Sequence, residues 1–258
     1  MNPNIRWFLR NNILDLLSLF SKPAKGIHIL NGHMISKNDS HIEVFLNQLE
    51  ELNKITTFIK IEDAVDLITQ RKKVDDVLIA FSFDDGFEEC ATMIAPALEQ
   101  FGTNGLFFIN PNFVEGDEAY IKNFTDNIVL APGKLPMRWD DIIKIRNAGH
   151  VIGAHTLDHF MINNNDLFEL EHQIGDCKKI IEANLGEPCD YFAIPFGKLE
   201  HANPASLDLA EKYYKYVFTQ SNYKSYFSYN GKAVNRRHFE PNWPVKHVKY
   251  FISHQKKY

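Results

Sequence analysis

The sequence predicts an α/β protein whose parallel strands form a barrel or a wrapped sheet. Seven short apolar runs alternate along the 258-residue chain with segments of helical hydrophobic spacing, and this alternation is typical of parallel strands joined by crossover helices. No proline-, glycine- or serine-rich linker and no internal repeat divides the chain, so we expect a single domain. In such folds the chemistry lies at the carboxyl ends of the strands.

The expected elements follow one another in strand–helix order. The apolar runs predict strands at 27–31, 77–83, 105–110, 151–154, 191–194, 216–219 and 233–239. The helical patterns predict helices at 41–52, 62–72, 87–101, 139–148, 166–185, 205–214 and 244–253. The segment 111–136 has loop composition, and a loop of that length in a compact domain is usually functional or partly structured.

An extra helix is expected before the first strand: residues 1–26 form an amphipathic helix with its lead-in, and residues 27–258 form the barrel domain. The apolar positions of 5–20 fall on one helical face, but two arginines and Asp15 interrupt them, whereas a membrane-spanning helix needs ~20 apolar residues. The charges also argue against a signal peptide, so we expect a cytoplasmic protein. The helix either packs on the domain or makes peripheral contact with the inner face of a membrane.

Composition excludes several classes of protein. The net charge of −5 and pI of about 6.1 argue against a nucleic-acid partner. The three cysteines include no C-x-x-C pair, which argues against a disulfide framework and a cysteine zinc site. Residues 212–258 nevertheless hold ten Lys/Arg and one acid. This basic segment is either a solvated surface whose charge is balanced by acidic residues elsewhere in the fold, or a contact for a phosphate-bearing substrate or acidic lipid.

Two motifs that follow expected strands predict a metal site. Asp84 and Asp85 directly follow the apolar strand 77–83, and His155 and His159 follow 151–154. Alone, the first motif could be turn chemistry and the second an ordinary histidine pair. Because strand ends converge in a barrel, two imidazoles and one carboxylate can share a hydrolytic metal ion if 155–159 turns helically, which leaves the other carboxylate as a general base.

A third motif closes the strand at 191–194. Pro195 and Phe196, followed by a glycine, form a rigid turn. The turn either simply ends the strand or presents backbone N–H groups to a developing oxyanion.

Together these motifs resemble a known family. The sequences SFDDG at 82–86, GHVIGAHTLDH at 149–159 and FAIPFG at 192–197 resemble the first three motifs of the polysaccharide deacetylases, the NodB-homology group or carbohydrate esterase family four. The resemblance covers about residues 27–240. It implies a distorted (β/α)7 barrel and the metal-dependent removal of an acyl group, normally acetyl, from the nitrogen of an amino sugar.

The resemblance also implies roles for individual residues. Asp84 matches the catalytic base, and the metal ligands match Asp85, His155 and His159. The metal implied is Zn²⁺, with Co²⁺ or Ni²⁺ as substitutes. In the Pro195–Phe196 turn, the Phe196 position supplies an oxyanion-binding N–H in the family.

The sequence departs from the family pattern in two places. Ala193 stands where the family carries an arginine that pairs with the base, and no C-terminal leucine-any-histidine motif supplies a general acid. However, IHILNGHMI at 27–35 resembles the circularly permuted branch that includes the poly-N-acetylglucosamine deacetylases. In that branch the acid histidine lies near the N-terminus, which implies His33 here.

The late strand around 234–238 also resembles that branch, in which it supplies an arginine near the site. Either Arg236 or Arg237 could orient the base in place of the missing arginine, because a guanidinium beside a carboxylate keeps it ionised. Of the two, Arg236 is favoured. His238 is an alternative acid, and His150 is expected to be structural.

The predicted function is therefore a metal-dependent N-deacetylase of a glycan or glycan precursor. The expected partner is an N-acetylated amino-sugar substrate, lipid- or nucleotide-linked, as in O-antigen or capsule biosynthesis. Two alternatives stay open: a deformylase or allantoinase-like amidase on the same scaffold, and a catalytically inactive sugar-binding homologue.

Overall fold

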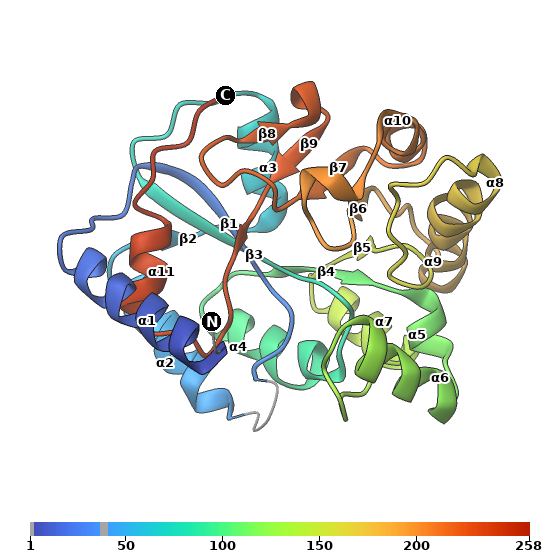
Figure 1. Ribbon diagram of the computed structural model, residues 1–258, viewed down its shortest axis with the longest axis horizontal. Helices are drawn as coiled ribbons and strands as arrows, with labels where there is room; N and C mark the ends of the chain where they lie inside the picture. The colour runs from blue at the N-terminus through green and yellow to red at the C-terminus, as the bar shows by residue number, and fades with distance from the viewer. Residues whose placement is uncertain (1–2, 37–40) are drawn as a thin grey trace.

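The computed structural model of this protein describes residues 3–36 and 41–258, with side chains from residue 8 onward (Figure 1). It is an α/β fold in which one ten-stranded sheet curls around an interior core, with most of the helices outside. The predicted fold class, a distorted (β/α) barrel in a single domain, is confirmed. The sheet order is β10-β1-β3-β4-β5-β6-β7-β9-β8, with β2 paired to β3.

The longer strands match the predicted ones closely, and three two-residue strands complete the sheet. The strands are β1 (Gly26–Gly32), β2 (Thr57–Phe58), β3 (Val77–Phe83), β4 (Gly105–Ile109), β5 (Val151–Ala154), β6 (Tyr191–Ala193), β7 (Tyr216–Thr219), β8 (Phe227–Ser228), β9 (Ala233–Asn235) and β10 (Arg237–His238). All neighbouring strands are parallel except β8 and β9.

The expected strand 233–239 is divided between two neighbours. Its first part, β9, pairs with β7, and its second part, β10, pairs with β1. The backbone N–H of Arg236, between the two, donates to Thr219 at 2.8 Å, and that of Phe239 donates to Asn31 at 2.9 Å. This one segment therefore joins the last parallel strand to the first and closes the barrel at Arg236.

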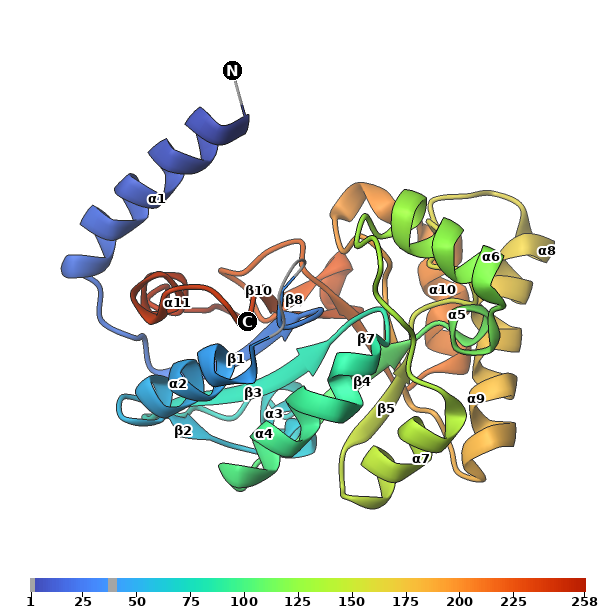
Figure 2. The same cartoon turned by 90° about the horizontal axis from the view of Figure 1, so that it is seen from below.

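Most of the helices pack on the outer side of the sheet (Figures 1 and 2). The α-helices are α1 (Pro3–Leu19), α2 (Ile42–Asn53), α3 (Ile61–Thr69), α4 (Ala95–Gln100), α5 (Pro111–Glu115), α6 (Glu118–Asn123), α7 (Trp139–Asn147), α8 (Leu167–Leu170), α9 (Cys177–Leu185), α10 (Pro204–Tyr213) and α11 (Val245–Phe251). Short π-helical segments, Cys90–Ile94, Phe124–Ile128 and Glu171–Asp176, adjoin α4, α6 and α9, and single 3₁₀ turns lie at Leu199–His201 and Tyr229–Gly231.

Two regions differ from the sequence prediction. The segment 111–136 carries α5, α6 and a π-helical turn in place of a loop, because its polar helices are too short to show a hydrophobic period. The helix predicted from 87 begins one residue later, at 88, since Phe87 bridges to Pro136.

The alternation of side chains along the strands directs Asp84 toward the barrel interior. Ile29, Ala80, Phe108 and Phe218 come from four different strands and belong to one buried cluster, together with side chains of α3. These residues therefore face the barrel interior, with α3 against them. Successive residues of a strand point to opposite faces, so the interior face of β3 continues from Ala80 through Ser82 to Asp84.

Candidate active site

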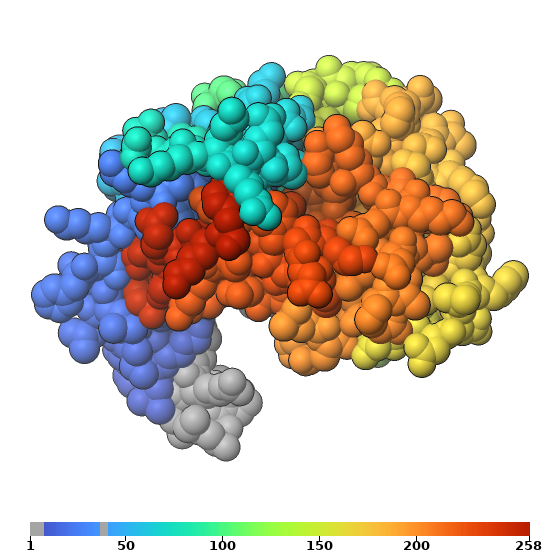
Figure 3. All heavy atoms as spheres, turned by 90° about the horizontal axis from the view of Figure 1, so that it is seen from above, coloured from blue at the N-terminus to red at the C-terminus, as the bar shows by residue number. Residues whose placement is uncertain are grey.

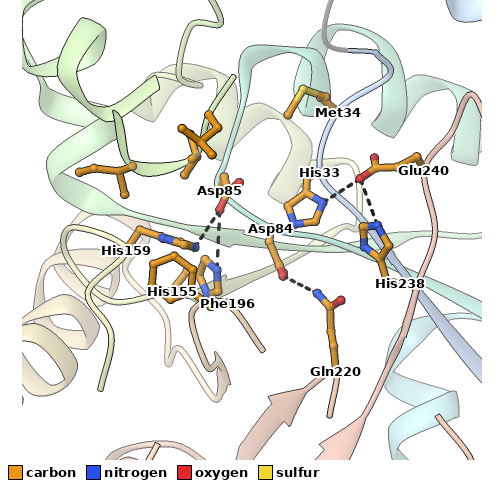
Figure 4. A pocket seen from close by; sticks show the side chains of 13 residues that line it. His33, Met34, Asp84, Asp85, His155, His159, Phe196, Gln220, His238 and Glu240 are labelled. Atoms are coloured by element: carbon orange, nitrogen blue, oxygen red, sulfur yellow. Dashed lines mark hydrogen bonds and ion pairs between the residues drawn. The ribbon is translucent and has the colours of Figure 1, made fainter. Parts of the chain in front are cut away.

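A cavity of about 380 Å³ opens at the carboxyl ends of the strands (Figure 4). Its wall is formed by residues that end or follow strands β1, β3, β5, β6, β7 and β10, and by 128–130 from the segment that was expected to be a loop. The predicted site residues His33, Asp84, Asp85, His155, His159 and Phe196 all line it. The convergence of strand ends thus brings together motifs far apart in the sequence.

Asp84 is held by a buried guanidinium. Arg236 Nη1 lies 2.7 Å from Asp84 Oδ1, and Nη2 lies 2.9 Å from Oδ2. Arg236 has no exposed surface, and its guanidinium carbon lies 4.8 Å from the centroid of the Phe108 ring. The predicted orienting arginine is therefore at Asp84, whereas the guanidinium of Arg237 packs on Tyr223 at 4.2 Å from the ring centroid.

Amide side chains complete the surroundings of Asp84. Asn31 Nδ2 donates to Asp84 Oδ2 at 2.9 Å, and Gln220 Nε2 lies 3.5 Å from the same oxygen. Burial raises the pKa of the Asp84 carboxyl, but the charge and hydrogen bonds of Arg236 lower it well below its ordinary value. Asp84 is therefore a fixed carboxylate throughout the neutral range.

Asp85, His155 and His159 form a compact ligand set. Asp85 Oδ1 lies 3.7 Å from His155 Nε2 and 3.6 Å from His159 Nε2. The expected helical turn is wrong: Thr156 and His159 have φ of +62° and +56°, so a left-handed turn brings the two imidazoles together. Asp85 and Phe196 also have positive φ, at +73° and +62°, and such backbone conformations in non-glycine residues cluster at functional sites.

The donor atoms of this set are suited to a cation. Asp85 Oδ1 is buried and has no hydrogen-bond partner. His155 Nδ1 lies 2.8 Å from the Ala193 carbonyl oxygen, which accepts its proton and leaves the Nε2 lone pair directed at Asp85. Burial raises the pKa of Asp85 to about 7 and lowers the pKa of His155 to about 4, because removal from water disfavours the charged form of each group. Two neutral imidazoles and one carboxylate fit a Zn²⁺, Co²⁺ or Ni²⁺ ion.

His33 faces the same cavity from the end of β1. Its Nδ1 lies 3.3 Å from Glu240 Oε1. Burial lowers the pKa of His33, but the hydrogen bond to Glu240 and the charges of Asp85, Glu240 and Asp84 raise it to about 9. His238 Nε2 lies 3.5 Å from the same Glu240 oxygen, but burial above all lowers its pKa to about 4. Of the two candidate acids, His33 is therefore the one that carries a proton at neutral pH.

The third motif lies at the rim of the cavity. The Phe196 ring packs against His159 at a centroid distance of 4.4 Å, and 43% of the residue is exposed. Pro195 is buried and does not line the cavity. His150 lies at the opposite ends of the strands, where its Nδ1 accepts the Gly105 N–H at 3.0 Å. This contact agrees with its expected structural role.

The sequence analysis did not identify three polar residues of the site: Asn31, Gln220 and Glu240. Asn31 lies within β1, Gln220 directly follows β7, and Glu240 lies two residues after β10. A systematic search for polar residues at the ends of all predicted strands could have found the last two.

Comparisons with known proteins agree with this geometry. A family model described as polysaccharide deacetylase matches residues 71–217, more than half of the chain. The curated Bacillus subtilis protein YxkH, whose name places it among the polysaccharide deacetylases, is 23% identical over 197 residues. That alignment covers 74% of this chain and 62% of YxkH.

Solved structures show the same fold at low sequence identity. IcaB from Ammonifex degensii has a TM-score of 0.71 at 19% identity, covering 90% of this chain and 99% of its own. The Streptococcus pyogenes deacetylase PplD, in complex with acetate, has a TM-score of 0.67 at 16% identity, covering 88% and 97%.

The segment matched by the family model contains Asp84, Asp85, His155, His159 and Phe196, whereas His33, Arg236 and Glu240 lie outside it. The three motifs, their convergence in one cavity and the matched segment lead to the same conclusion: this chain belongs to the polysaccharide deacetylase family.

Proposed function

We propose that this protein is a metal-dependent N-deacetylase of an amino-sugar glycan or glycan precursor. One observation carries the proposal. Asp84, fixed by Arg236, lies beside the ligand set of Asp85, His155 and His159 in one cavity, and the protonated His33 lines the same cavity (Figure 4). Amide hydrolysis needs a base for water, a means of polarising the carbonyl and an acid for the leaving amine.

Asp85, His155 and His159 would hold the metal, which we propose to be Zn²⁺, with Co²⁺ or Ni²⁺ as substitutes. A divalent ion there supplies Lewis acidity: it polarises the acetamide carbonyl and lowers the pKa of water. Because Asp85 Oδ1 and both imidazole Nε2 atoms are already close together, the chain needs little rearrangement to bind the ion.

Asp84 accepts the proton of the attacking water. Arg236 and Asn31 hold its two oxygens in place, so the carboxylate meets the water in one orientation. His33 then gives its Nε2 proton to the sugar nitrogen as the C–N bond breaks, while its Nδ1–H stays hydrogen-bonded to Glu240. The products are acetate and a free amine. The backbone of the Pro195–Phe196 turn would bind the developing oxyanion.

The N-terminal helix suggests where the substrate is found. Most apolar side chains of α1, and that of Phe20, which directly follows it, face solvent, with Leu16 62%, Leu19 72% and Phe20 84% exposed, whereas Leu14 and Ser18 face the protein. Polar contacts help to attach the helix: Asp15 Oδ1 lies 2.6 Å from His247 Nε2 on α11. Figures 2 and 3 show the N-terminal segment at one end of the molecule, beside the C-terminal segment.

We propose that this apolar face of α1 lies in the interface of an anionic membrane. None of the helices within residues 3–36 and 41–258 has the length and hydrophobicity that crossing a bilayer requires. An amphipathic helix with basic neighbours binds an anionic lipid surface. The basic neighbours here are Lys22 and Lys25, which follow α1 in the chain, and Lys246, whose Nζ lies 2.9 Å from Asp15 Oδ1. A lipid-linked amino-sugar substrate fits this placement better than a nucleotide-linked one. The cytoplasmic location stays a prediction.

The function is tested by acetate release from N-acetylglucosamine oligomers, with formate release from N-formylated analogues measured in parallel. We expect metal-dependent acetate release by the wild type. Asp84→Asn should abolish release while the metal stays bound, and His33→Ala should lower the rate by about 10²–10⁴-fold, the range typical of a general acid. Full activity of Asp84→Asn would refute the assignment of the base.

A further inference from the structure

The cavity contains a second set of ligand-type side chains: His33, His238 and Glu240. One nitrogen of each imidazole and one oxygen of the carboxylate lie within 4.8 Å of one another. This set shares the cavity with Asp85, His155 and His159 but shares no residue with them. Figure 4 shows its three side chains directed toward one another.

We propose that His33, His238 and Glu240 bind a second transition-metal ion when the metal is in excess, and that this ion inhibits the enzyme. The ligand atoms are already spaced for coordination. Glu240 Oε1 lies 3.3 Å from His33 Nδ1 and 3.5 Å from His238 Nε2. In a tetrahedral site with bonds of about 2.0–2.1 Å, neighbouring ligand atoms lie about 3.3 Å apart.

The backbone fixes this arrangement. In the parallel pair of β1 and β10, Asn31 is in register with His238. His33 follows Asn31 by two residues and Glu240 follows His238 by two, so all three ligands extend from neighbouring strand ends. The His238 ring also packs edge-on against Trp243, at a centroid distance of 5.2 Å. Binding an ion therefore requires little ordering of the side chains.

The chemistry of the donors selects the ion. Two imidazoles and one carboxylate favour Zn²⁺, Ni²⁺ or Co²⁺ over Mg²⁺ or Ca²⁺, which prefer oxygen ligands. The side chains of His33, His238 and Glu240 are 24%, 40% and 26% exposed, so an ion can enter from solvent. The Asp85 set is buried, and we expect the more exposed second set to bind its ion with lower affinity.

The inhibition rests on the proposed role of His33. As the acid, His33 carries a proton on both nitrogens and releases the one on Nε2. A metal ion on Nδ1 replaces one of these protons, and releasing the other would leave an imidazolate, which is unfavourable at neutral pH. The second ion therefore removes the proton donor while Asp84 and the Asp85 set stay intact.

The test measures zinc bound per chain by equilibrium dialysis of metal-free protein against rising Zn²⁺ up to millimolar concentration. We expect two bound ions per chain in the wild type and one, at the high-affinity Asp85 set, in His238→Ala. His159→Ala should lose this high-affinity ion and keep the low-affinity one. His172→Ala is the matched control, because His172 also contacts a carboxylate, with Nδ1 2.9 Å from Asp176 Oδ2, but lies on the surface. His238→Gln replaces His238→Ala if the smaller side chain impairs folding.

One ion in the wild type, or two ions in both His238 variants, would overturn the proposal. Inhibition is measured as the ratio of each protein's rate at tenfold excess Zn²⁺ to its own rate at one equivalent. We expect this ratio to be one-fifth or less in the wild type and close to one in His238→Ala. A wild-type ratio close to one would refute inhibition. If no deacetylation occurs at any metal concentration, the proposed function fails, whereas the zinc stoichiometry still decides whether the second site exists.

Discussion

Arg236 binds both carboxylate oxygens of Asp84, through Nη1 at 2.7 Å and Nη2 at 2.9 Å. The guanidinium comes from the segment that closes the barrel, and it stands at Asp84 in a chain that has Ala193 at the usual arginine position of the third family motif. The same residue thus closes the sheet and orients the proposed base. Removing it would leave a buried, unpaired carboxylate, which typically costs about 3–5 kcal/mol of stability.

Arg236→Lys keeps the charge but loses the fork that holds both oxygens. We expect kcat to fall by about 10²-fold, the cost of a misplaced catalytic group, with the metal content unchanged. Steady-state kinetics and metal analysis measure both quantities. Arg237→Lys is the control, since Arg237 packs on Tyr223 and Phe251. Wild-type kcat in Arg236→Lys would show that the bidentate contact does not position the base.

Glu240→Gln should change the pH dependence of deacetylation. Glu240 raises the pKa of His33, which reaches about 9. The acid form is present below that pKa and is lost as pH rises through it. Removing the carboxylate lowers the pKa, so we expect the basic limb of the kcat–pH profile to move to lower pH. Glu99→Gln, which alters the remote His150–Glu99 pair, should leave the profile unchanged, and an unmoved limb in Glu240→Gln would contradict the role given to His33.

A charge at Phe20, which directly follows α1 and extends its apolar face, should weaken membrane binding. We expect Phe20→Asp to lower the fraction of protein that sediments with vesicles of phosphatidylglycerol and phosphatidylcholine by at least fivefold. Phe168→Asp is a matched control, because Phe168 on α8 is also 84% exposed and should leave sedimentation unchanged. Equal losses in both variants, or no binding by the wild type, would contradict the proposed interfacial role of α1.

Lys256 should make the stability of the fold depend on pH. The side chain is buried at the opposite end of β1, where burial, with the charge of Arg237, lowers its pKa from 10.5 to about 7. Between these values the unfolded chain binds more protons than the native one, so the contribution of Lys256 to stability increases with pH through this window. We expect the free energy of unfolding, measured by urea denaturation, to rise by about 1–3 kcal/mol from pH 6 to pH 9 in the wild type. Lys256→Met should remove this rise. The control Lys257→Met, a change at the exposed neighbouring residue, should retain it. An identical rise in all three proteins would show that Lys256 is not its source.

The sequence predicted the buried centre of the site because its chemistry is local. Asp84, Asp85, His155 and His159 each directly follow or lie close to the end of an apolar strand, and parallel strand ends meet in a barrel. Arg236 could be predicted only through the family resemblance, since nothing near it in the chain indicates its partner. The turn at 155–159 could not be predicted, because positive φ at Thr156 and His159 is imposed by the packed site rather than by local propensity.

The contact between His33 and Glu240 could not be predicted from the sequence, for a different reason. Glu240 and His33 are 207 residues apart, and their contact depends on the register of β1 with β10. A two-residue strand such as β10 carries too little pattern to predict a register. The helices α5 and α6 were missed because each is only one or two turns long.

The central claim is that Asp85, His155 and His159 hold the metal on which hydrolysis depends. Its most direct test is the zinc content of protein dialysed against sub-micromolar free Zn²⁺, for the wild type, His159→Ala and the surface control His172→Ala. We predict about one ion per chain in the wild type and the control and none in His159→Ala, because a ligand to the metal has been removed. Absence of zinc from the wild type, or equal zinc in all three proteins, would contradict the account.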